Sequence, residues 1–346
     1  MNHMININLY SDTQTKPTQE MLKALSSAEV GDEQHRKDPT VNQLCRKTAA
    51  LMGKEDAMFL PSGTMCNQIA ILVHCSPGDE IIADKTAHIL ISESGGPAAL
   101  AGALIYPLEG ENGIFNAVQV NESVRGSSLH VPRSRLVVVE QTSNQGGGTI
   151  WPLERLKEIR DTALNHDLKL HMDGARLMNA SVATGVSASD YANNVDSVWL
   201  DLTKGLGCPV GAVLAGSNDF ISEAWRWKHR LGGALRQAGI LAAAGIWALD
   251  HHVDRLAQDH DNAKIMAQRI SEIPGMKINF STIQSNLVFF DVSETGKDAK
   301  QLSEELQNQG VWIGALNQKV MRAVTHLDVS LSQIHKAIDI LKDLTH

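Results

Sequence analysis

Apolar residues along the chain alternate between short continuous runs and helical repeats. Four runs contain few polar residues, as strands buried on both faces do: residues 135–141, 168–173, 196–202 and 212–216. Between the first two runs, Leu153, Leu156 and Ile159 recur at helical spacing, and Pro152 fits the first position of that helix. Strand–helix–strand order predicts right-handed crossovers and a mainly parallel sheet with helices on its faces.

The pattern changes after about residue 239. We predict five elements there: a long helix over residues 256–270 that stops before Pro274, a strand at residues 285–292, a helix ending at Gly310, a short strand pair within residues 311–325, and a last helix capped by Ser332. This order is typical of a small α/β domain. We therefore predict a large α/β domain with an N-terminal arm at residues 1–249 and a small C-terminal α/β domain at residues 250–346.

The composition narrows the class of protein. A net charge of −8 without a long basic block argues against a nucleic-acid-binding surface. No apolar run reaches the roughly 20 residues of a membrane span, and the N-terminus lacks the basic start and apolar stretch of a secretory signal. Four cysteines without CxxC spacing are interpreted as reduced thiols of a cytoplasmic protein. No ligand cluster indicates a metal site, so none is expected.

Two reactive side chains follow apolar runs. Asp173 ends the run at residues 168–173, and Lys204 follows the run at residues 196–202 in a glycine-rich turn. Ligands of parallel sheets bind at the carboxyl ends of the strands, so both side chains are expected at one edge. A lysine that forms a Schiff base and an acid that keeps a ring nitrogen protonated are what pyridoxal phosphate requires. Alternatively, Asp173 caps a helix and Lys204 is an exposed lysine.

A tight turn between a strand and a helix is predicted at Ser62, Gly63 and Thr64. Backbone N–H groups at the start of a helix, together with the hydroxyls and the positive end of the helix dipole, can bind a phosphate dianion. The alternative is a well-capped helix without a ligand. No GxGxxG or Walker lysine is present, so dinucleotide or nucleoside-triphosphate binding has little support.

Three more residues have the chemistry that such a site needs. His88 could stack on a pyridine ring and transfer protons near neutral pH. Arg176, three residues after Asp173, could favour the ionised form of the cofactor's phenolic oxygen, and Arg322 could bind an amino-acid carboxylate. Alternatively, His88 is a surface or core histidine, Arg176 is a surface or ion-pair residue, and Arg322 is a solvated charge at a strand end.

The order of these residues resembles that of the fold-type I pyridoxal-phosphate enzymes. The detailed strings resemble the low-specificity L-threonine aldolase family within the β-eliminating lyase group. The matching stretches are residues 11–17, 30–33, 38–41, 61–64, 87–88, 171–176, 203–207, 232–237 and 322–328. They are spread over nearly the whole chain, which makes the resemblance specific.

The resemblance implies an aspartate aminotransferase-like fold with a seven-stranded, mainly parallel sheet. It also implies the roles of site residues. Lys204, beside Thr203, would carry the Schiff base, Asp173 would bond the pyridine nitrogen, and Arg176 would approach the ring oxygen. The remaining roles are phosphate binding by Ser62, Gly63 and Thr64, ring stacking by His88, substrate binding by Ser11 and Arg322, and contributions to the site from Lys228 or His229 and from Arg236 of a neighbouring subunit.

The sequence departs from many relatives at two positions. A histidine expected near the substrate hydroxyl is replaced by Ser143, in the stretch Glu140-Gln-Thr-Ser-Asn, and an aromatic residue of a substrate loop is replaced by His35. Both positions concern recognition of the substrate side chain, and Ser143 is predicted to contact the substrate. The preference of the protein for threonine or allo-threonine therefore stays open. Neither departure affects the predicted cofactor chemistry.

The resemblance implies an aldehyde-lyase, that is a carbon–carbon lyase. It would cleave L-threonine, L-allo-threonine and related L-β-hydroxy-α-amino acids to glycine and an aldehyde by retro-aldol chemistry. Lys204, Asp173 and His88 would be the catalytic residues, with His88 or a water that it orders as the base. Alternatives on the same scaffold are 3-hydroxyaspartate or phenylserine aldolase and a β-eliminating lyase. A non-catalytic descendant is disfavoured because Lys204, Asp173, Arg176 and Arg322 are all retained. The expected assembly is a homotetramer, a dimer of dimers with shared active sites, and the expected partner is a small amino acid.

Overall fold

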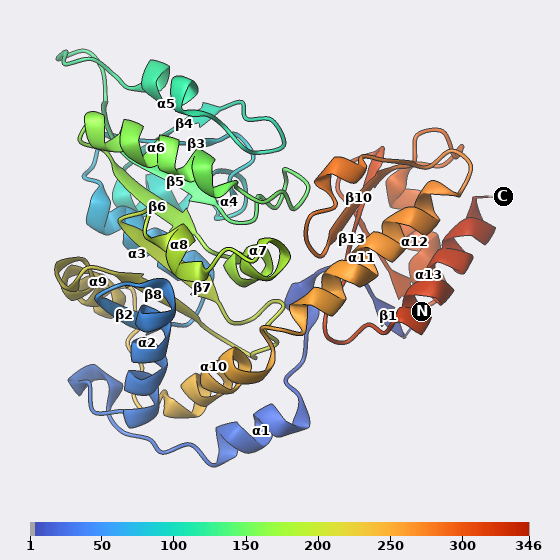
Figure 1. Ribbon diagram of the computed structural model, residues 1–346, viewed down its shortest axis with the longest axis horizontal. Coiled ribbons are helices and arrows are strands. Elements are labelled where there is room, and N and C mark those ends of the chain that lie inside the picture. Colours follow the sequence, from blue (N-terminus) through green and yellow to red (C-terminus); the bar gives the residue numbers. More distant parts are fainter. Residues whose placement is uncertain (1–3, 346) are drawn as a thin grey trace.

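A seven-stranded sheet forms the centre of the larger of two lobes (Figure 1) in the computed structural model, which describes residues 4–345. In spatial order its strands are β2 (Asp56–Leu60), β8 (Ala212–Gly216), β7 (Ser197–Asp201), β6 (Lys169–Asp173), β5 (Arg133–Glu140), β3 (Asp79–Asp84) and β4 (Leu104–Leu108). The five strands from β7 to β4 are parallel, and β8 is antiparallel to both of its neighbours. The predicted α/β class with a mainly parallel sheet is confirmed.

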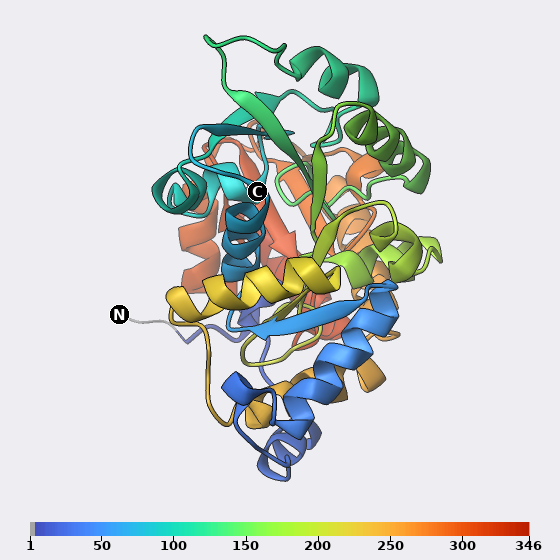
Figure 2. The ribbon, with the colours of Figure 1, turned by 90° about the vertical axis from the view of Figure 1, so that its left-hand side faces the viewer.

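Both faces of the sheet are buried, which is why its strands are apolar runs. In β5, Val137 and Val139 pack into the core on one face, whereas Leu136 and Val138 pack into the core on the other. Figures 1 and 2 show helices on both sides of the sheet. The helices of this lobe are α1 (Gln19–Ser26), α2 (Pro39–Met52), α3 (Gly63–His74), α4 (His88–Ile91), α5 (Ala117–Ser123), α6 (Leu153–Asn165), α7 (Leu177–Thr184), α8 (Ala188–Ala192), α9 (Asn218–Arg230) and α10 (Gly239–His251).

Short turns supplement these helices. Turns of 3-10 helix lie at Asp12–Gln14, Glu33–His35 and Phe280–Thr282, and a π-helical turn lies at Pro97–Ala101. The helix predicted after Pro152 is α6, although Pro152 is its cap residue rather than its first residue. All four cysteines are free thiols. None of the helices described within residues 4–345 is long and apolar enough to cross a membrane.

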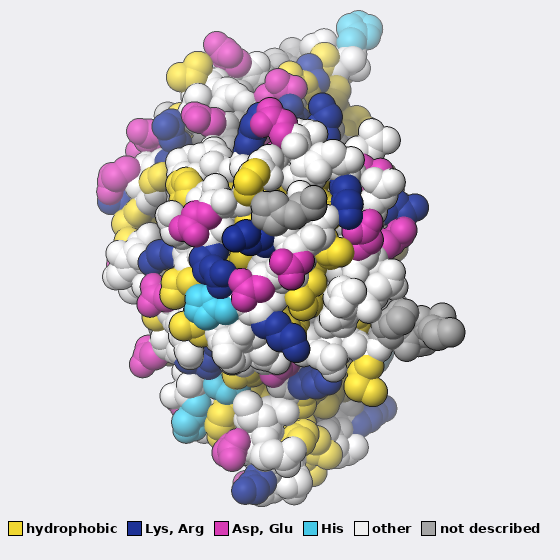
Figure 3. All heavy atoms as spheres, turned by 90° about the vertical axis from the view of Figure 1, so that its right-hand side faces the viewer, with side chains coloured by type: hydrophobic (Ala, Val, Ile, Leu, Met, Phe, Trp, Pro, Cys, Tyr) yellow, Lys and Arg dark blue, Asp and Glu magenta, His cyan; other side chains and the backbone are white. Residues whose placement is uncertain are grey.

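The smaller lobe contains a four-stranded sheet in the order β12 (Gly314–Ala315), β13 (Val320–Val324), β10 (Leu287–Asp291) and β9 (Lys277–Ile278). Its helices are α11 (Leu256–Ser271), α12 (Ala299–Asn308) and α13 (Leu331–Leu344). The prediction that Ser332 caps the last helix is wrong. Ser330 is the cap, because its side chain accepts the backbone N–H of Gln333 in a capping box. The outer face of this lobe carries interspersed basic and acidic side chains (Figure 3).

The N-terminal segment packs with the smaller lobe. Strand β1 (Ile7–Asn8) pairs in parallel with β11 (Val311–Trp312), and Ile7 and Leu9 belong to the core of that lobe. The predicted strand pair within residues 311–325 is therefore only partly right, since β12 pairs with β13 but β11 pairs with β1. We propose residues 249 and 250, in the last turn of α10, as the boundary between the domains, because α11 packs into the core of the smaller lobe.

A buried ion pair attaches the turn at residues 33–35 to α9. Lys228 and Glu33 are paired with almost no exposure, and Lys228 also donates to the Phe59 carbonyl at 2.7 Å. The second Glu33 oxygen accepts the Leu235 backbone N–H at 2.7 Å. A charge left unpaired in such a place is strongly destabilising.

Substitution of Glu33 by Gln should therefore lower the free energy of unfolding by roughly 3–5 kcal/mol, because it leaves the Lys228 charge buried without its partner. The midpoint of urea denaturation measures this loss. Glu294→Gln is the matched control, since Glu294 pairs with Lys277 at the surface, where both side chains are more than half exposed. Equal midpoints for the two variants would contradict the importance of the buried pair.

Candidate active site

A cavity of about 330 Å³ lies where β5, β6 and β7 end, beside the start of α3 and strand β13 of the smaller lobe. Parallel strands end at the same edge of a sheet, so the residues that follow them are brought together. Ten of the residues predicted from the sequence line this cavity: Ser11, Ser62, Gly63, Thr64, His88, Asp173, Arg176, Thr203, Lys204 and Arg322. The cavity also lies between the two domains, which places residues of both on its walls.

Lys204 lies in the turn after β7, and its amine forms an ion pair with Asp201, the last residue of that strand. Thr203 donates its backbone N–H and its hydroxyl to the other Asp201 oxygen, both at 2.8 Å. The Lys204 nitrogen also lies 5.6 Å from the centre of the Trp199 ring. The lysine side chain is 19% exposed, so it is not a freely solvated lysine.

Asp173 is a buried carboxylate at the end of β6. One oxygen accepts the side-chain amide of Asn67 at 2.8 Å, and the other accepts the backbone N–H of Ala175 at 3.0 Å. Burial raises the pKa of Asp173, although the charges of His88 and Lys204 and the Asn67 bond act in the opposite direction. Asp173 is not a helix cap, because α7 begins at Leu177 with Arg176 as its cap residue.

His88 is the first residue of α4 and is half-buried. Its Nδ1 atom lies 2.8 Å from the buried carboxylate of Glu93. This hydrogen bond raises the pKa of His88 above its ordinary value, despite partial burial. When Nδ1 carries the proton that bonds Glu93, Nε2 is the ring atom left to exchange protons.

Glu140, the last residue of β5, is a further acid of the cavity wall. Its two oxygens accept the backbone N–H groups of His88 and Asn144, each at 2.8 Å. Burial, together with the nearby negative charge of Asp173, raises the pKa of Glu140 to about 7. This carboxyl group therefore binds a proton more readily than an exposed glutamate does.

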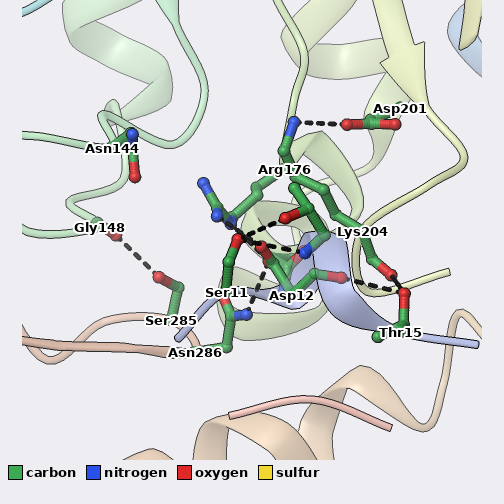
Figure 4. Close-up of polar contacts among 12 residues, drawn as sticks. Ser11, Asp12, Thr15, Asn144, Gly148, Arg176, Asp201, Lys204, Ser285 and Asn286 are labelled. Atoms are coloured by element: carbon green, nitrogen blue, oxygen red, sulfur yellow. Dashed lines mark hydrogen bonds and ion pairs between the residues drawn. The ribbon is translucent and has the colours of Figure 1, made fainter. Parts of the chain in front are cut away.

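Arg176 is held by a buried bidentate ion pair with Asp12. Its Nε and Nη2 atoms donate to the two Asp12 oxygens at 2.8 and 2.7 Å, and Asn286 donates to the same carboxylate at 3.0 Å (Figure 4). Burial would raise the pKa of Asp12, but the charge and hydrogen bonds of Arg176 outweigh it and hold that pKa well below its ordinary range. Arg176 is thus a buried ion-pair residue that lines the cavity, not a surface residue.

The turn at the start of α3 has the features of an anion site. Ser62 caps the helix by accepting the backbone N–H of Met65 at 3.2 Å, and the first amides of a helix have no partner within it. A Cβ at Gly63 would lie 2.2 Å from the Trp199 ring, so only glycine allows this close approach. Ser62 is therefore a helix cap, and the same turn presents free N–H groups to the cavity.

Arg322 on β13 reaches the cavity from the smaller lobe. Its guanidinium donates to Asn144 Oδ1 at 3.1 Å and to the Tyr10 carbonyl at 3.4 Å, and its Nε atom is buried without a hydrogen-bond partner. Within residues 4–345 the guanidinium pairs with no carboxylate. Ser11 lines the same cavity and accepts the Thr13 hydroxyl at 2.8 Å. An arginine with free donors in a cleft is suited to bind a carboxylate.

Several predicted residues lie elsewhere. Ser143 is buried, its backbone pairs with that of Thr149, and it is not among the residues that line the cavity, so its predicted contact with a substrate stays a prediction. Arg236 is exposed and forms a surface ion pair with Asp32. Lys228 is buried against Glu33, whereas His229 is exposed, and the contribution of either residue to a neighbouring subunit stays a prediction.

Six residues of the cavity wall were not predicted from the sequence: Thr13, Glu140, Asn144, Ala175, Trp199 and Asp201. Glu140 and Asn144 lie in the stretch examined only for its missing histidine. Asp201 is three residues before Lys204, so proximity in the sequence was an available signal. Nothing in the sequence marks Glu93, which does not line the cavity but bonds His88, a residue that does.

The donor set of the cavity fits pyridoxal phosphate. Four features surround one space. They are the Lys204 amine, the buried Asp173 carboxyl group, the start of α3, where a Cβ at Gly63 would clash, and Arg322 with its unpartnered nitrogen. His88, Glu93 and Asp173 also bring three ligand-type atoms within 4.8 Å of one another. The hydrogen bonds of His88 and Asn67 to these carboxylates account for that closeness, and we assign no cation to it.

The sequence is similar to that of known proteins. The model of the family described as beta-eliminating lyase matches residues 8–293. The chain is 41% identical over 329 residues to the low specificity L-threonine aldolase of Escherichia coli K12, covering 95% of this chain and 96% of that protein. It is 36% identical over 338 residues to low-specificity L-threonine aldolase 1 of Arabidopsis thaliana, covering 96% and 94%.

Solved structures share the fold. A threonine aldolase of Leishmania major superposes with a TM-score of 0.84 at 20% identity, covering 98% of this chain and 100% of that chain. A serine palmitoyltransferase of Sphingomonas wittichii superposes with a TM-score of 0.75 at 18% identity, covering 97% and 86%. These likenesses establish the fold-type I architecture.

The bond between His88 and Glu93 generates a pH prediction. The pKa of His88 should lie above about 6.5 in the native protein and should fall in the Glu93→Gln variant, because the amide cannot stabilise an imidazolium as a carboxylate does. Histidine ¹⁵N NMR during a pH titration measures this pKa. Because the folded-state pKa is raised, the stabilisation that this bond contributes is present below the unfolded-state value and is lost as the pH rises through the folded-state value.

The control for this titration is Glu109→Gln, since Glu109 forms an exposed pair with Lys85 and does not contact His88. The control should leave the pKa of His88 unchanged. An unchanged pKa in Glu93→Gln as well would show that the carboxylate does not determine the charge of the histidine.

Proposed function

The chain belongs to the β-eliminating lyase family, and on that premise we propose that it is a pyridoxal-phosphate-dependent aldehyde-lyase. It cleaves L-threonine, L-allo-threonine and related L-β-hydroxy-α-amino acids to glycine and an aldehyde. The observation that carries this proposal is that Lys204, Asp173, His88 and Arg322 line one cavity with the start of α3. When bound, the cofactor supplies an electron-accepting ring that makes the Cα–Cβ bond of the amino acid cleavable.

The residues that would hold the cofactor come from the large domain. The Lys204 amine is the attachment point, and Thr203 and Asp201 fix the turn that carries it. Asp173 is assigned to the ring nitrogen and Arg176 to the phenolic oxygen, both from rigid positions at the end of β6. The backbone N–H groups of Gly63 and Thr64 and the hydroxyl of Ser62 are assigned to the phosphate.

The substrate would be oriented by two anion-binding contacts and one proton-transfer group. Arg322 and Ser11 bind its carboxylate, which gives the unpartnered Arg322 nitrogen an acceptor. His88, held at Nδ1 by Glu93, accepts the β-hydroxyl proton at Nε2, directly or through a water. Glu140 holds the backbone of His88 and lies close enough to Asp173 that their charges interact.

Assembly and location extend this proposal. We assign the chain to a homotetramer, a dimer of dimers, in which Arg236 and His229 complete the site of a neighbouring subunit. The support is that both side chains are exposed and lie outside the cavity of their own chain. A cytoplasmic location is proposed because all four cysteines are free thiols, as expected in a reducing compartment.

The test of the reaction is an absorbance spectrum before and after addition of L-allo-threonine, with acetaldehyde and glycine assayed in the same sample. The native protein should absorb near ~420 nm, as a protonated Schiff base does, and should release both products. Lys204→Ala should lose this band and essentially all turnover. Asp173→Ala should keep its fold but lose at least about a hundredfold in kcat, since the ring is no longer kept protonated.

The products separate this reaction from its alternatives. Pyruvate and ammonia from a substituted alanine would indicate β-elimination, and glycine with glyoxylate or benzaldehyde would indicate cleavage of 3-hydroxyaspartate or phenylserine. Aldolase turnover by Lys204→Ala would refute the assignment of the lysine. No band after reconstitution with the cofactor would refute the proposal as a whole.

Shared active sites are tested by hybrid assemblies. Lys204→Ala and Arg236→Ala should each have low activity alone, but mixed subunits refolded together should recover part of it, because some sites then combine an intact Lys204 with an intact Arg236. Activity of the mixture after size-exclusion chromatography measures the recovery. If the mixture is no more active than the sum of its parts, Arg236 acts within its own chain or not at all.

A further inference from the structure

Asn67, on the buried side of α3, links the two acids beside the cavity. Its side-chain nitrogen lies 2.8 Å from Asp173 Oδ2 and 2.7 Å from Glu93 Oε1. Glu93 in turn bonds the His88 ring. Asn67 has no exposed surface and does not line the cavity. One amide thus contacts the acid assigned to the cofactor nitrogen and the acid that holds the ring histidine.

The orientation of this amide is dictated by its neighbours. The indole Nε1 of Trp199 lies 2.7 Å from Asn67 Oδ1. An indole N–H can only donate a hydrogen bond, so the Asn67 atom facing it must be the oxygen. The NH₂ group therefore faces the carboxylates, and it has two protons for the two acceptors. No flipped amide would satisfy both sides.

The same argument determines which atom donates in each hydrogen bond of a longer network that runs from His74 to Asn67. His171 Nε2 lies 3.2 Å from Asn67 Oδ1, so it must donate. Burial lowers the pKa of His171 to about 3, which leaves the ring neutral with an accepting Nδ1 atom. That atom accepts the Ser197 hydroxyl at 2.8 Å, and Ser197 Oγ accepts His74 Nε2 at 2.7 Å. In this hydrogen-bond network, each side chain donates to the next one in the direction of Asp173 and Glu93.

We propose that Asn67 is a positioning residue of the reaction, which holds the carboxylates of Asp173 and Glu93 side by side and favours the ionised form of Asp173, because Trp199 and His171 fix the direction of its amide. This inference rests on the proposed role of Asp173 at the cofactor nitrogen. Hydrogen bonds to an ionised carboxylate favour the ionised form, which opposes the effect of burial. Without Asn67, the buried Asp173 carboxylate would lose a hydrogen bond that favours its ionised form, so it would bind a proton more readily.

The groups that act on Asp173 lie on several elements. They are His88 and Glu93 at α4 and the segment after it, Lys204 after β7, Glu140 on β5, and Cys66 beside Asn67 on α3. His88 and Lys204 favour the charged acid, whereas Glu93 and Glu140 oppose it. Besides these titratable groups, the neutral side chain of Asn67 donates a hydrogen bond directly to Asp173.

The first test is histidine ¹⁵N NMR of the full-length protein purified with its cofactor, with the signals assigned by comparison with His171→Phe. His171 should be neutral from about pH 5 to pH 8 and should carry its proton on Nε2. A proton on Nδ1, or a titration within that range, would overturn the proposed direction of the hydrogen-bond network. This result does not depend on whether the protein is an aldolase.

The second test compares Asn67→Asp, which keeps the size of the side chain but replaces the NH₂ group by a carboxyl oxygen, with Asn67→Leu, which has no donor. Both should move the acid limb of the kcat/KM profile upward by about one pH unit, because Asp173 loses a hydrogen bond that favours its charged form. Both should also raise the dissociation constant of the cofactor about tenfold, since one bond to a charged group is worth roughly that factor.

Asn262→Leu is the matched control, because Asn262 is also a buried asparagine of a helix but lies on α11, outside the cavity. It should change neither the acid limb nor the affinity for the cofactor. If Asn67→Asp also leaves both unchanged, Asn67 has a structural role only and the proposal fails. If the native protein has no aldolase activity, the cofactor affinity and the His171 proton still decide the role of Asn67 separately from the proposed function.

Discussion

The buried ion pair between Asp12 and Arg176 is the contact on which the shape of the cavity depends. Arg176 follows the central strand β6, Asp12 follows the N-terminal strand, and Asn286 of the smaller lobe bonds the same carboxylate. These partners are 164 and 274 positions from Asp12 along the chain. A buried pair of this kind gains little net stability over apolar residues, but it strongly penalises any arrangement that separates its partners. The pair therefore fixes how the two domains face each other across the site.

The acidic side chains in and around the cavity fall into two groups, those with a cationic or protonatable partner and those without a lysine or arginine partner among the described residues. Three acids are matched with cationic or protonatable side chains: Asp12 with Arg176, Asp201 with Lys204, and Glu93 with His88. Asp173 and Glu140 differ, since within residues 4–345 no lysine or arginine is hydrogen-bonded to either of them. Burial raises the pKa of both, and the charge of Asp173 contributes to the shift at Glu140. A positively charged ring nitrogen would supply the partner that Asp173 lacks.

Local sequence patterns predicted much of the sheet and about half of the cavity wall because both depend on short segments, whereas Ser11 and Thr203 were implied by the family resemblance. Apolar runs identify strands buried on two faces, and a residue directly after such a strand lies at the carboxyl edge whatever its partners are. Asp173 and Lys204 were found in this way. The two-residue strand β1 could not be found, because its structure depends on β11 rather than on its own pattern.

Hydrogen-bond partners were the part that the sequence concealed. Asp12 was missed because its partner Arg176 is 164 positions away, and Glu93 was missed because its partners His88 and Asn67 lie on other elements of the fold. Helix caps depend on nearer contacts, since Ser62 acts on an amide three residues away, although the last helix was assigned Ser332 rather than Ser330 as its cap. Contacts within a few residues are readable from sequence, and contacts between folded segments are not.

The pairing of β1 with β11 has a consequence for synthesis on the ribosome. Roughly 300 residues separate these two strands, which at 5–20 residues per second is about 15 to 60 seconds of translation. Throughout that interval the apolar side chains of Ile7 and Leu9 lack the core that buries them in the finished protein. The sheet of the large domain can form as it emerges, but the cavity cannot close until the last strands have been made. A nascent chain therefore exposes an apolar N-terminal segment to which a chaperone can bind. The protein can bind its cofactor in a complete cavity only near the end of synthesis.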